Sequence, residues 1–214
     1  MNLTSHHGHL VEPPPIYWQN LSEKDQQTLQ MPDALFKAIS WMQLREITQT
    51  AVTQGLLQRQ PSVLRKYLEY SYRIRMRYGS IYNYIITERL KWNNSIVSMG
   101  TTFADCRDWA ILWNDWPYGI ENNIVHLIVW TKFPLNQDSE TGELMPEAKD
   151  MINQFVDDTF GKAVGGENVL RFKNIKSLSS VHEIEHFHVM LKNPDPIFLQ
   201  WVTNGDTPVQ EVAF

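Results

Sequence analysis

The hydrophobic pattern of the first half of the chain is that of helices. Apolar side chains recur every three or four residues from about residue 34 to residue 92, a spacing that places them on one helix face. Ser22, Pro32-Asp33 and Pro61-Ser62 are helix-start signals, and Gly79 is a helix-stop signal. The pattern therefore predicts helices over residues 22–29, 34–58, 61–78 and 80–92.

After Asn93-Asn94 the pattern changes to that of strands. Short runs rich in β-branched and aromatic residues replace the helical spacing. Pro117, Gly119 and Asn122-Asn123 separate the first two runs and favour an antiparallel hairpin. One amphipathic helix, from Pro146 to about Phe160, is expected among the strands. The predicted strands cover residues 108–114, 124–131, 168–172 and about 185–191, and residues 198–202 suit either a strand or a short helix.

Helices followed by strands indicate an α+β fold. The chain has 214 residues, of which 43% are hydrophobic and 12% aromatic, enough for one ordinary domain with its own core. The consecutive prolines Pro13–Pro15 cannot enter a helix interior. We therefore expect a flexible leader over residues 1–15 and a single domain over 16–214, with a helical part (16–94) and a sheet part (103–214).

Charge and cysteine content limit the classes of binding partner and the cellular compartment that we expect. The net charge of −5 gives no attraction to a polyphosphate backbone, so no nucleic-acid partner is expected. No run approaches the ~20 apolar residues of a membrane span and the N-terminus lacks a signal peptide, so no membrane partner is expected either. Cys106 is the only cysteine, which favours the cytoplasm, with or without the nucleus, and we expect a buried or inert thiol.

His186 and His188 are the first candidates for chemistry. They lie two residues apart in a strand-like run, so both imidazoles project from one face while Phe187 and Val189 project from the other. Such a pair can ligate a metal, or one ring can act as nucleophile or base while the other orients a phosphate. The alternative is two half-buried histidines that bind backbone carbonyls.

Four pieces of sequence around this pair occur in a characteristic order. They are Asn114-Asp115-Trp116-Pro117, the run 126–132, Asn174 with Ser180-Val181, and His186-Phe187-His188-Val189. In this order they resemble the histidine-triad superfamily of nucleotidyl hydrolases and transferases, over residues 108–191. The resemblance implies a homodimer and a histidine-triad-like sheet, with His186 as the nucleophile that forms a phosphohistidine at the α-phosphorus. It also implies ligand-binding roles around His188 for Asn114, His126, Lys132, Asn174 and Ser180.

The sequence departs from this superfamily at Ile184, where the first histidine of the triad is expected. With two of three histidines left, a non-catalytic, ligand-binding regulatory protein is an alternative to an enzyme.

Further motifs extend over nearly the whole chain. They are Pro61-Ser62-Val63-Leu64-Arg65, Tyr78-Gly79-Ser80, Glu88-Arg89-Leu90-Lys91-Trp92, Asn114-Asp115-Trp116-Pro117-Tyr118-Gly119, Val129-Trp130-Thr131-Lys132-Phe133 and Glu185-His186-Phe187-His188-Val189. Together they resemble a fungal family, the N-acetylglucosamine-induced proteins. The resemblance implies a fungal cytosolic protein connected with amino-sugar or secondary metabolism, and it implies no particular reaction.

Metal binding is the second hypothesis. His182-Glu183-Ile184-Glu185-His186 fits the H-E-x-x-H pattern of zinc proteases, which works only on a helix, whereas a strand-like run follows here. The alternative to a site without a cofactor is a metal-dependent enzyme that acts on a small metabolite. Its divalent metal would be held by His186 and His188, with His126, His182 or a glutamate as third ligand.

Basic residues gather in the helical half, and they have two possible roles. They are Arg65, Lys66, Arg73, Arg75, Arg77, Arg89 and Lys91. They either form a solvated helix face or turn toward the histidines as counter-charge for a phosphate. Our leading prediction is an α+β domain whose helical part packs on a mainly antiparallel sheet. It binds, and hydrolyses or transfers, a nucleotide or nucleotide-sugar phosphate, with His186 as nucleophile or base.

Overall fold

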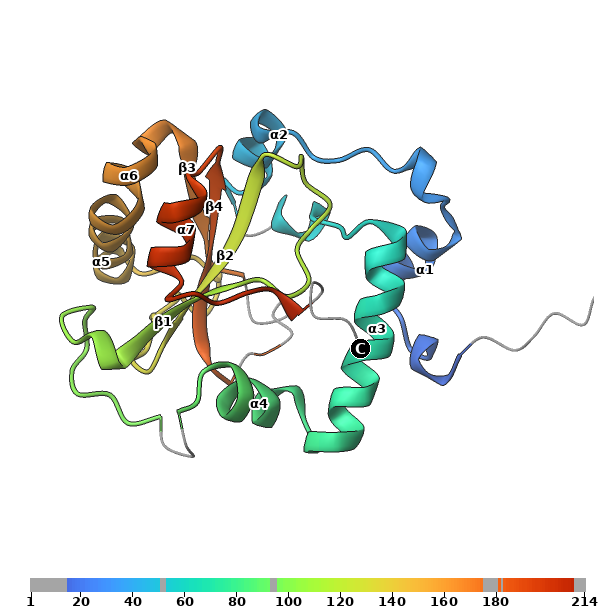
Figure 1. Ribbon diagram of the computed structural model, residues 1–214, viewed down its shortest axis with the longest axis horizontal. Helices are drawn as coiled ribbons and strands as arrows, with labels where there is room; N and C mark the ends of the chain where they lie inside the picture. The colour runs from blue at the N-terminus through green and yellow to red at the C-terminus, as the bar shows by residue number, and fades with distance from the viewer. Residues whose placement is uncertain (1–14, 51–52, 93–95, 175–180, 182, 210–214) are drawn as a thin grey trace, which may run out of the picture.

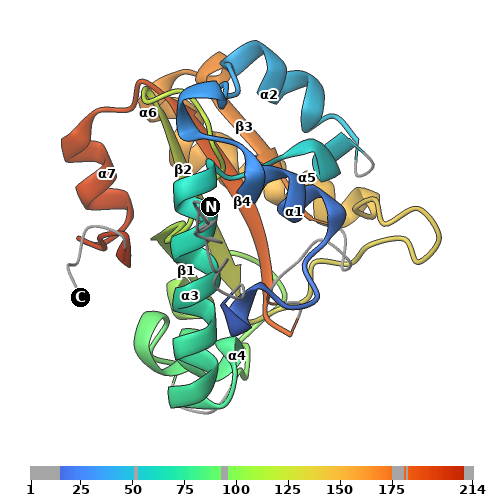
Figure 2. The ribbon, with the colours of Figure 1, turned by 90° about the vertical axis from the view of Figure 1, so that its right-hand side faces the viewer.

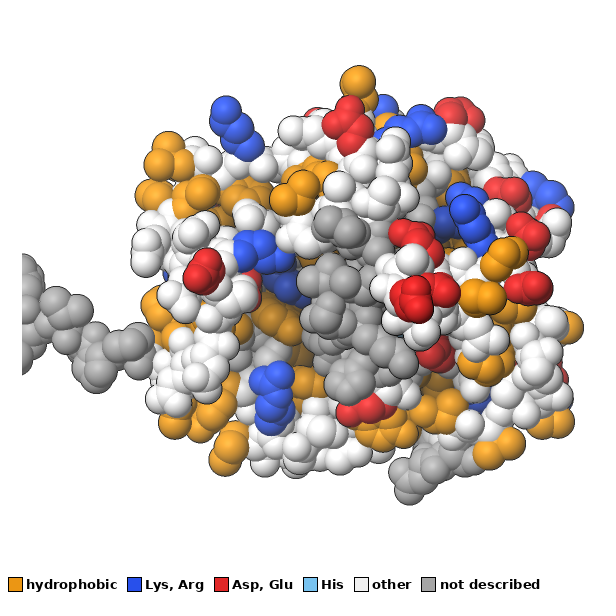
Figure 3. Space-filling view, turned by 180° about the vertical axis from the view of Figure 1, so that it is seen from behind, with side chains coloured by type: hydrophobic (Ala, Val, Ile, Leu, Met, Phe, Trp, Pro, Cys, Tyr) orange, Lys and Arg blue, Asp and Glu red, His pale blue; other side chains and the backbone are white. Residues whose placement is uncertain are grey.

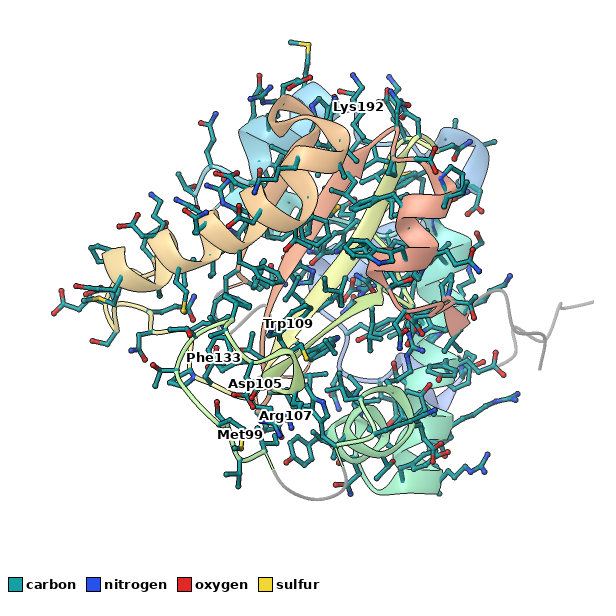
Figure 4. The ribbon with its side chains drawn as sticks, turned by 60° about the vertical axis from the view of Figure 1, so that its left-hand side comes forward. Met99, Asp105, Arg107, Trp109, Phe133 and Lys192 are labelled. Carbon is teal, nitrogen blue, oxygen red and sulfur yellow. The ribbon has the colours of Figure 1, made fainter. Side chains whose placement is uncertain are left out.

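The centre of the molecule is a four-stranded antiparallel sheet. The computed structural model describes residues 15–50, 53–92, 96–174, 181 and 183–209, so the predicted leader lies almost entirely outside the described residues. The strand order is β1-β2-β4-β3, with bounds β1(Trp109–Trp113), β2(Ile124–Thr131), β3(Val169–Phe172) and β4(Glu185–Lys192). All four predicted strands and the predicted hairpin between the first two are therefore confirmed. Figure 4 shows Lys192 at one end of this sheet and Trp109 at the other.

One face of the sheet carries the main apolar core. Alternate residues of the central strands, among them Leu127, Val129 and Phe187, are at most 1% exposed and pack in one cluster with helix side chains. The helices behind this face are α5(Pro146–Val156), its continuation through the π-helical turn η6(Asp157–Gly161) into α6(Lys162–Val164), and α7(Pro196–Val202). Figure 1 shows α5 and α6 on one side of the sheet, with α1 and α3 on the other. The main core lies between this face and α5.

The opposite face carries the histidines, and we call it the histidine face. The antiparallel register pairs Trp130 with His186, Ile128 with His188, and His126 with Met190. Two apolar clusters cover its ends: Trp41 and Leu44 pack near Met190, and the residues around Ile86 pack on Trp130. The middle of the face, where the histidines lie, is covered less tightly.

The helices over the histidine face come from the N-terminal half. Their bounds are η1(Ile16–Trp18), α1(Glu23–Gln30), α3(Pro61–Tyr78), and α4(Ile81–Tyr84) with the π-helical turn η4(Ile85–Arg89). The Ser22 side chain accepts a hydrogen bond from the Asp25 backbone N–H at 3.1 Å, and Gly79 ends α3 with a positive φ of 78°, so both predicted signals are confirmed. In Figure 2, α3 lies in front of the strands.

The predicted helix over residues 34–58 is wrong. The segment instead forms η2(Asp33–Leu35), α2(Trp41–Ile47) and η3(Thr53–Leu56). Ser40 and Gln43 form a reciprocal capping box that starts a new helix at Trp41. Just before it, the backbone of Ile39 is extended and pairs with Ile120 of the loop between β1 and β2. A contact across 81 residues thus replaced a local helical turn.

Shorter elements complete the chain, with bounds η5(Cys106–Asp108) and η7(Gly166–Asn168). Residues 198–202 belong to a helix, α7, whose first turn is capped by Asp195, so the strand alternative is wrong. Cys106 is exposed rather than buried. Its neighbour Asp108 is fully buried, and its carboxylate accepts hydrogen bonds from the backbone N–H groups of Met99 (2.8 Å) and Gly100 (3.1 Å).

The surface shows no large field of one charge on the face seen from behind, where Lys and Arg side chains are interspersed with Asp and Glu (Figure 3). Among the described residues, no helix combines the length and the hydrophobicity that a bilayer crossing requires.

The apolar face predicts a large effect for one substitution. Phe187 is 1% exposed and contacts the rings of Phe103 and Phe155. We expect Phe187→Ala to lower the free energy of unfolding by about 3–5 kcal/mol, because it removes buried apolar area and leaves a cavity. Urea unfolding measures the loss. Met42→Ala, at a position that is 74% exposed, is the control and should stay within about 0.5 kcal/mol; a similar loss in both variants would contradict the packing described.

Candidate functional site

A cavity of about 630 Å³ lies between the histidine face and the N-terminal helices. Its volume is in the range of small-molecule sites. Described residues from both halves of the chain line this cavity. Among them are Lys24, Arg59, Tyr67, Tyr70, Arg89, Asn114, Asp115, Trp116, Tyr118, Trp130, Asn174, His186 and His188. The site therefore depends on contact between the two halves.

His186 presents an unprotonated nitrogen to this cavity. Its Nδ1 lies 2.7 Å from the carbonyl oxygen of Ile184, and because a carbonyl only accepts, Nδ1 must carry the proton. In the neutral ring, Nε2 then has a free lone pair, and no described residue binds it. The ring packs against Trp130, with centroids 4.6 Å apart. Burial lowers the pKa of His186 to about 4, so the ring is neutral at pH 7.

His188 is held at both ring nitrogens. The amide nitrogen of Asn174 donates to Nε2 at 3.1 Å, so the proton of the neutral ring is on Nδ1. Nδ1 lies 2.9 Å from Nε2 of His126 and donates to it. Phe172 stacks on the His188 ring at 4.9 Å. Burial lowers the pKa of His188 well below its ordinary value. With both nitrogens engaged, His188 positions its neighbours rather than reacts.

His126 supports this arrangement from the neighbouring strand. The register places it diagonally from His188 on the same face of the sheet. Tyr118 stacks on its ring with centroids 5.2 Å apart. The Oδ1 atom of Asn114 accepts from the Trp116 N–H at 3.0 Å, which turns the Asn114 amide nitrogen to the His126 ring, 3.2 Å from each ring nitrogen. Burial lowers the pKa of His126 to about 3.

Arg59 is a cavity residue that the sequence did not reveal. Its Nε donates to the Trp116 carbonyl at 3.0 Å, and its guanidinium lies 4.1 Å from the Tyr67 ring centre and 5.7 Å from that of Tyr118. Within the described ranges, no acidic side chain forms an ion pair with it. Its only sequence signal was proximity to the helix start at Pro61, which says nothing about ligand binding.

Arg89 is the opposite case, because it is fully paired. It donates to both carboxylate oxygens of Asp206, at 2.7 and 2.9 Å, and its Nη2 lies 2.9 Å from Oδ1 of Asp115. Asp206 also accepts from the Trp113 N–H, and Asp115 accepts from the Val209 N–H. Burial raises the pKa of Asp115 to about 6. This network fastens the segment 203–209 to the rim of the cavity.

Other predicted site residues lie elsewhere. Lys132 does not line the cavity, and its Nζ lies 5.2 Å above the Trp92 ring. Ser180 and His182 lie outside the described residues. Of the seven basic residues singled out in the helical half, only Arg89 lines the cavity; Arg65, for example, binds the Leu29 carbonyl. Among the described residues, which do not include His182, no group of three or more His, Cys, Asp or Glu side chains is placed to hold a metal.

A family model described as "Protein of unknown function (DUF3605)" matches residues 40–192. The chain belongs to the DUF3605 family. The matched segment of this DUF3605 protein contains Arg59, His126, Asn174, His186 and His188, whereas Asp206 lies beyond it.

Two fungal relatives accompany the family match. N-acetylglucosamine-induced protein 1 of Candida albicans is 36% identical over 106 residues, which cover 48% of this DUF3605 chain and 42% of that protein. An uncharacterized protein of Saccharomyces cerevisiae is 27% identical over 160 residues, covering 72% and 79% of the two chains. These relatives support the predicted resemblance to the fungal N-acetylglucosamine-induced proteins. The chain spans about two fifths of the Candida protein.

The crystal structure of HTC1 superposes on the DUF3605 chain with a TM-score of 0.61 at 23% identity, covering 82% of this chain and 97% of HTC1. The two share a fold.

The low pKa values of the histidines predict the pH dependence of stability. The pKa of His186 in the folded chain is about 4, below the usual 6.5. Between these two pH values the ring binds a proton in the unfolded chain but not in the folded chain. The contribution of His186 to the free energy of unfolding is therefore fully present above pH 6.5. It decreases as the pH is lowered, by up to about 1.4 kcal/mol per pH unit. His126 acts in the same direction, and the raised pKa of Asp115 acts in the opposite one.

Urea unfolding at pH 7, 6 and 5 isolates the His186 contribution. We expect a shallower loss of stability with falling pH in His186→Gln than in the unchanged protein, because the variant lacks one of the titrating rings while Asp115 contributes equally to both. Identical pH slopes would show that His186 is not desolvated as described.

Proposed function

We propose that this chain binds a nucleotide or nucleotide-sugar phosphate in the cavity and hydrolyses or transfers it, with Nε2 of His186 as nucleophile or base. One observation carries the proposal: the hydrogen bond from Nδ1 of His186 to the Ile184 carbonyl leaves Nε2 unprotonated at a cavity wall. A neutral imidazole with a free lone pair is the form that attacks phosphorus.

The cavity suits such a ligand in size and lining. Its volume of about 630 Å³ accommodates a nucleotide, and Tyr67, Tyr70 and Trp116 offer aromatic surface for a planar base or a sugar ring. Asn174 and the histidines offer polar atoms along the sheet. The name of the N-acetylglucosamine-induced relative favours a nucleotide sugar within this class.

The chemistry needs no further reactant than water or an acceptor alcohol. Nε2 attacks the phosphorus, an N–P bond forms, and the P–O bond to the leaving group breaks, with the electron pair departing on that oxygen. Water or the acceptor alcohol then attacks the phosphorus, and the N–P bond breaks with its electron pair returning to Nε2. The attacking O–H releases a proton, which balances the one taken up by the departing oxygen. His188 and Asn174 hold the neighbouring wall in place during both steps.

The resemblance to the histidine-triad superfamily supports this assignment, and its departure at Ile184 is compatible with it. The Ile184 side chain is 1% exposed in an apolar cluster, while the group that binds His186 is the Ile184 backbone carbonyl. Because the backbone supplies the acceptor, the orientation of the nucleophile survives the loss of the first histidine side chain.

The test is labelling of the full chain with α-³²P-nucleotides and nucleotide sugars, followed by an acid-labile, base-stable phosphohistidine assay and product analysis. We expect label and product with the unchanged protein, and a loss of at least about a thousandfold in His186→Ala. Lys149→Gln, on the exposed side of α5, is the control and should keep full activity. Undiminished turnover in His186→Ala would remove His186 from the mechanism.

Tight binding of a nucleotide without label or product across the panel would contradict the transfer step and leave a ligand-binding protein. Circular dichroism of His186→Ala separates loss of the nucleophile from loss of the fold.

A further inference from the structure

Arg59 is a preorganised cation that pairs with no acidic side chain among the described residues. Its planar guanidinium is half-buried, stacked on Tyr67, and fixed at Nε by the Trp116 carbonyl. Among the described residues, nothing binds the two terminal nitrogens. Arg89 shows what this chain does with a guanidinium that serves structure, because three carboxylate oxygens surround it. Arg59 instead faces the cavity with its fork free.

We propose that Arg59 anchors a phosphate group of the ligand through its two Nη nitrogens. This deepens the proposed function and rests on it for the identity of the cavity as the ligand site. A guanidinium fork matches two oxygens of a phosphate, and a partly desolvated one binds more strongly because less water must be displaced.

The backbone around Arg59 is held in place for this role. The Gly119 N–H donates to the Gln58 carbonyl at 2.7 Å, so the loop between β1 and β2 lies directly against the segment before α3. A Cβ at Gly119 would lie 2.3 Å from the Phe36 ring and 3.2 Å from the Gln60 nitrogen, so only glycine allows this approach. Lys24 adds a second positive charge to the lining, and the carbonyls of Gly55 and Leu57 hold its ammonium.

The anchored phosphate is a different group from the one that faces His186. The Arg59 guanidinium lies 5.7 Å from the centre of the Tyr118 ring, which stacks on His126 with centroids 5.2 Å apart and lies 6.3 Å from the centre of the His188 ring. Arg59 therefore lies toward the His126–His188 end of the site. Successive same-face positions on a strand are roughly 6.6 Å apart. His186 and His188 are two such positions on β4, so we expect the ligand to carry its anchored phosphate away from the atom that meets Nε2 of His186.

The experiment titrates the full chain with inorganic phosphate and then with pyrophosphate, following the Hε1 resonances of His126 and His188 by NMR and the heat of binding by calorimetry. We expect saturable binding that shifts both resonances. Arg59→Gln should weaken binding by about tenfold or more, and Arg59→Lys by less, since it keeps the charge and loses the fork. Sodium acetate at equal ionic strength should bind more weakly than phosphate.

Two controls separate the anchor from other effects. Arg75→Gln removes the same charge from an exposed position of α3 and should leave phosphate affinity unchanged. Lys149→Gln, on the exposed side of α5, should also leave it unchanged. Equal phosphate affinity in Arg59→Gln and the unchanged protein would overturn the proposal, and so would the absence of saturable binding to the unchanged protein.

The outcomes distinguish the two proposals. Arg59-dependent phosphate binding without a phosphohistidine would refute the transfer reaction alone, and labelling of His186 that is indifferent to Arg59 would refute the anchor alone. If Arg59→Gln fails to fold, Arg59→Lys decides, because undiminished phosphate affinity there would contradict recognition by the guanidinium fork.

Discussion

The pairing of β2 with β4 is the constraint on which the site depends. Eight residues of each strand pair without interruption, from Ile124 with Lys192 to Thr131 with Glu185. Because side chains alternate along a strand, this register assigns the three histidines to one face and Leu127, Val129 and Phe187 to the other. A slip of one residue would bring Phe187 and Val189 into the cavity and bury His186 and His188 against α5. The large apolar interface with α5 therefore fixes the position of the polar groups behind it.

Burial assigns different roles to three side chains of the same chemical type. All three histidines are neutral because water is excluded from them, and each neutral ring has one donor and one acceptor nitrogen. His188 uses both on Asn174 and His126, and His186 uses only its donor, on a backbone carbonyl. The difference in hydrogen-bond partners leaves the His186 ring available to a ligand, whereas the His188 ring holds its neighbours in position.

Local patterns predicted most of the fold. The run of β-branched and aromatic residues located β2 at its observed bounds, and the two-residue spacing of His186 and His188 predicted their common face. The capping pair Ser40 and Gln43 was also present in the sequence, but the apolar spacing across it suggested one long helix. What ended that helix was the pairing of Ile39 with a loop 81 residues away, which no local pattern contains.

The candidate site was predictable only in part, for the same physical reason. Asn114, His126 and Asn174 do meet the histidine pair, whereas Lys132 lies on Trp92 outside the cavity. Arg59 enters from the other half of the chain through its contacts with Trp116, Tyr67 and Tyr118. A single arginine in a polar stretch has no distinguishing neighbours in sequence, so only the assembled fold shows that its charge is unpaired.

The network of Arg89, Asp115 and Asp206 has a consequence for the order of assembly. Asp206 joins two groups made much earlier in translation, the Arg89 guanidinium and the Trp113 backbone, across sequence separations of 117 and 93 residues. Until the nascent chain reaches Asp206, Arg89 lacks two of its carboxylate contacts at the cavity rim. The rim is therefore completed only after the whole sheet, which ends at Lys192, has been synthesised.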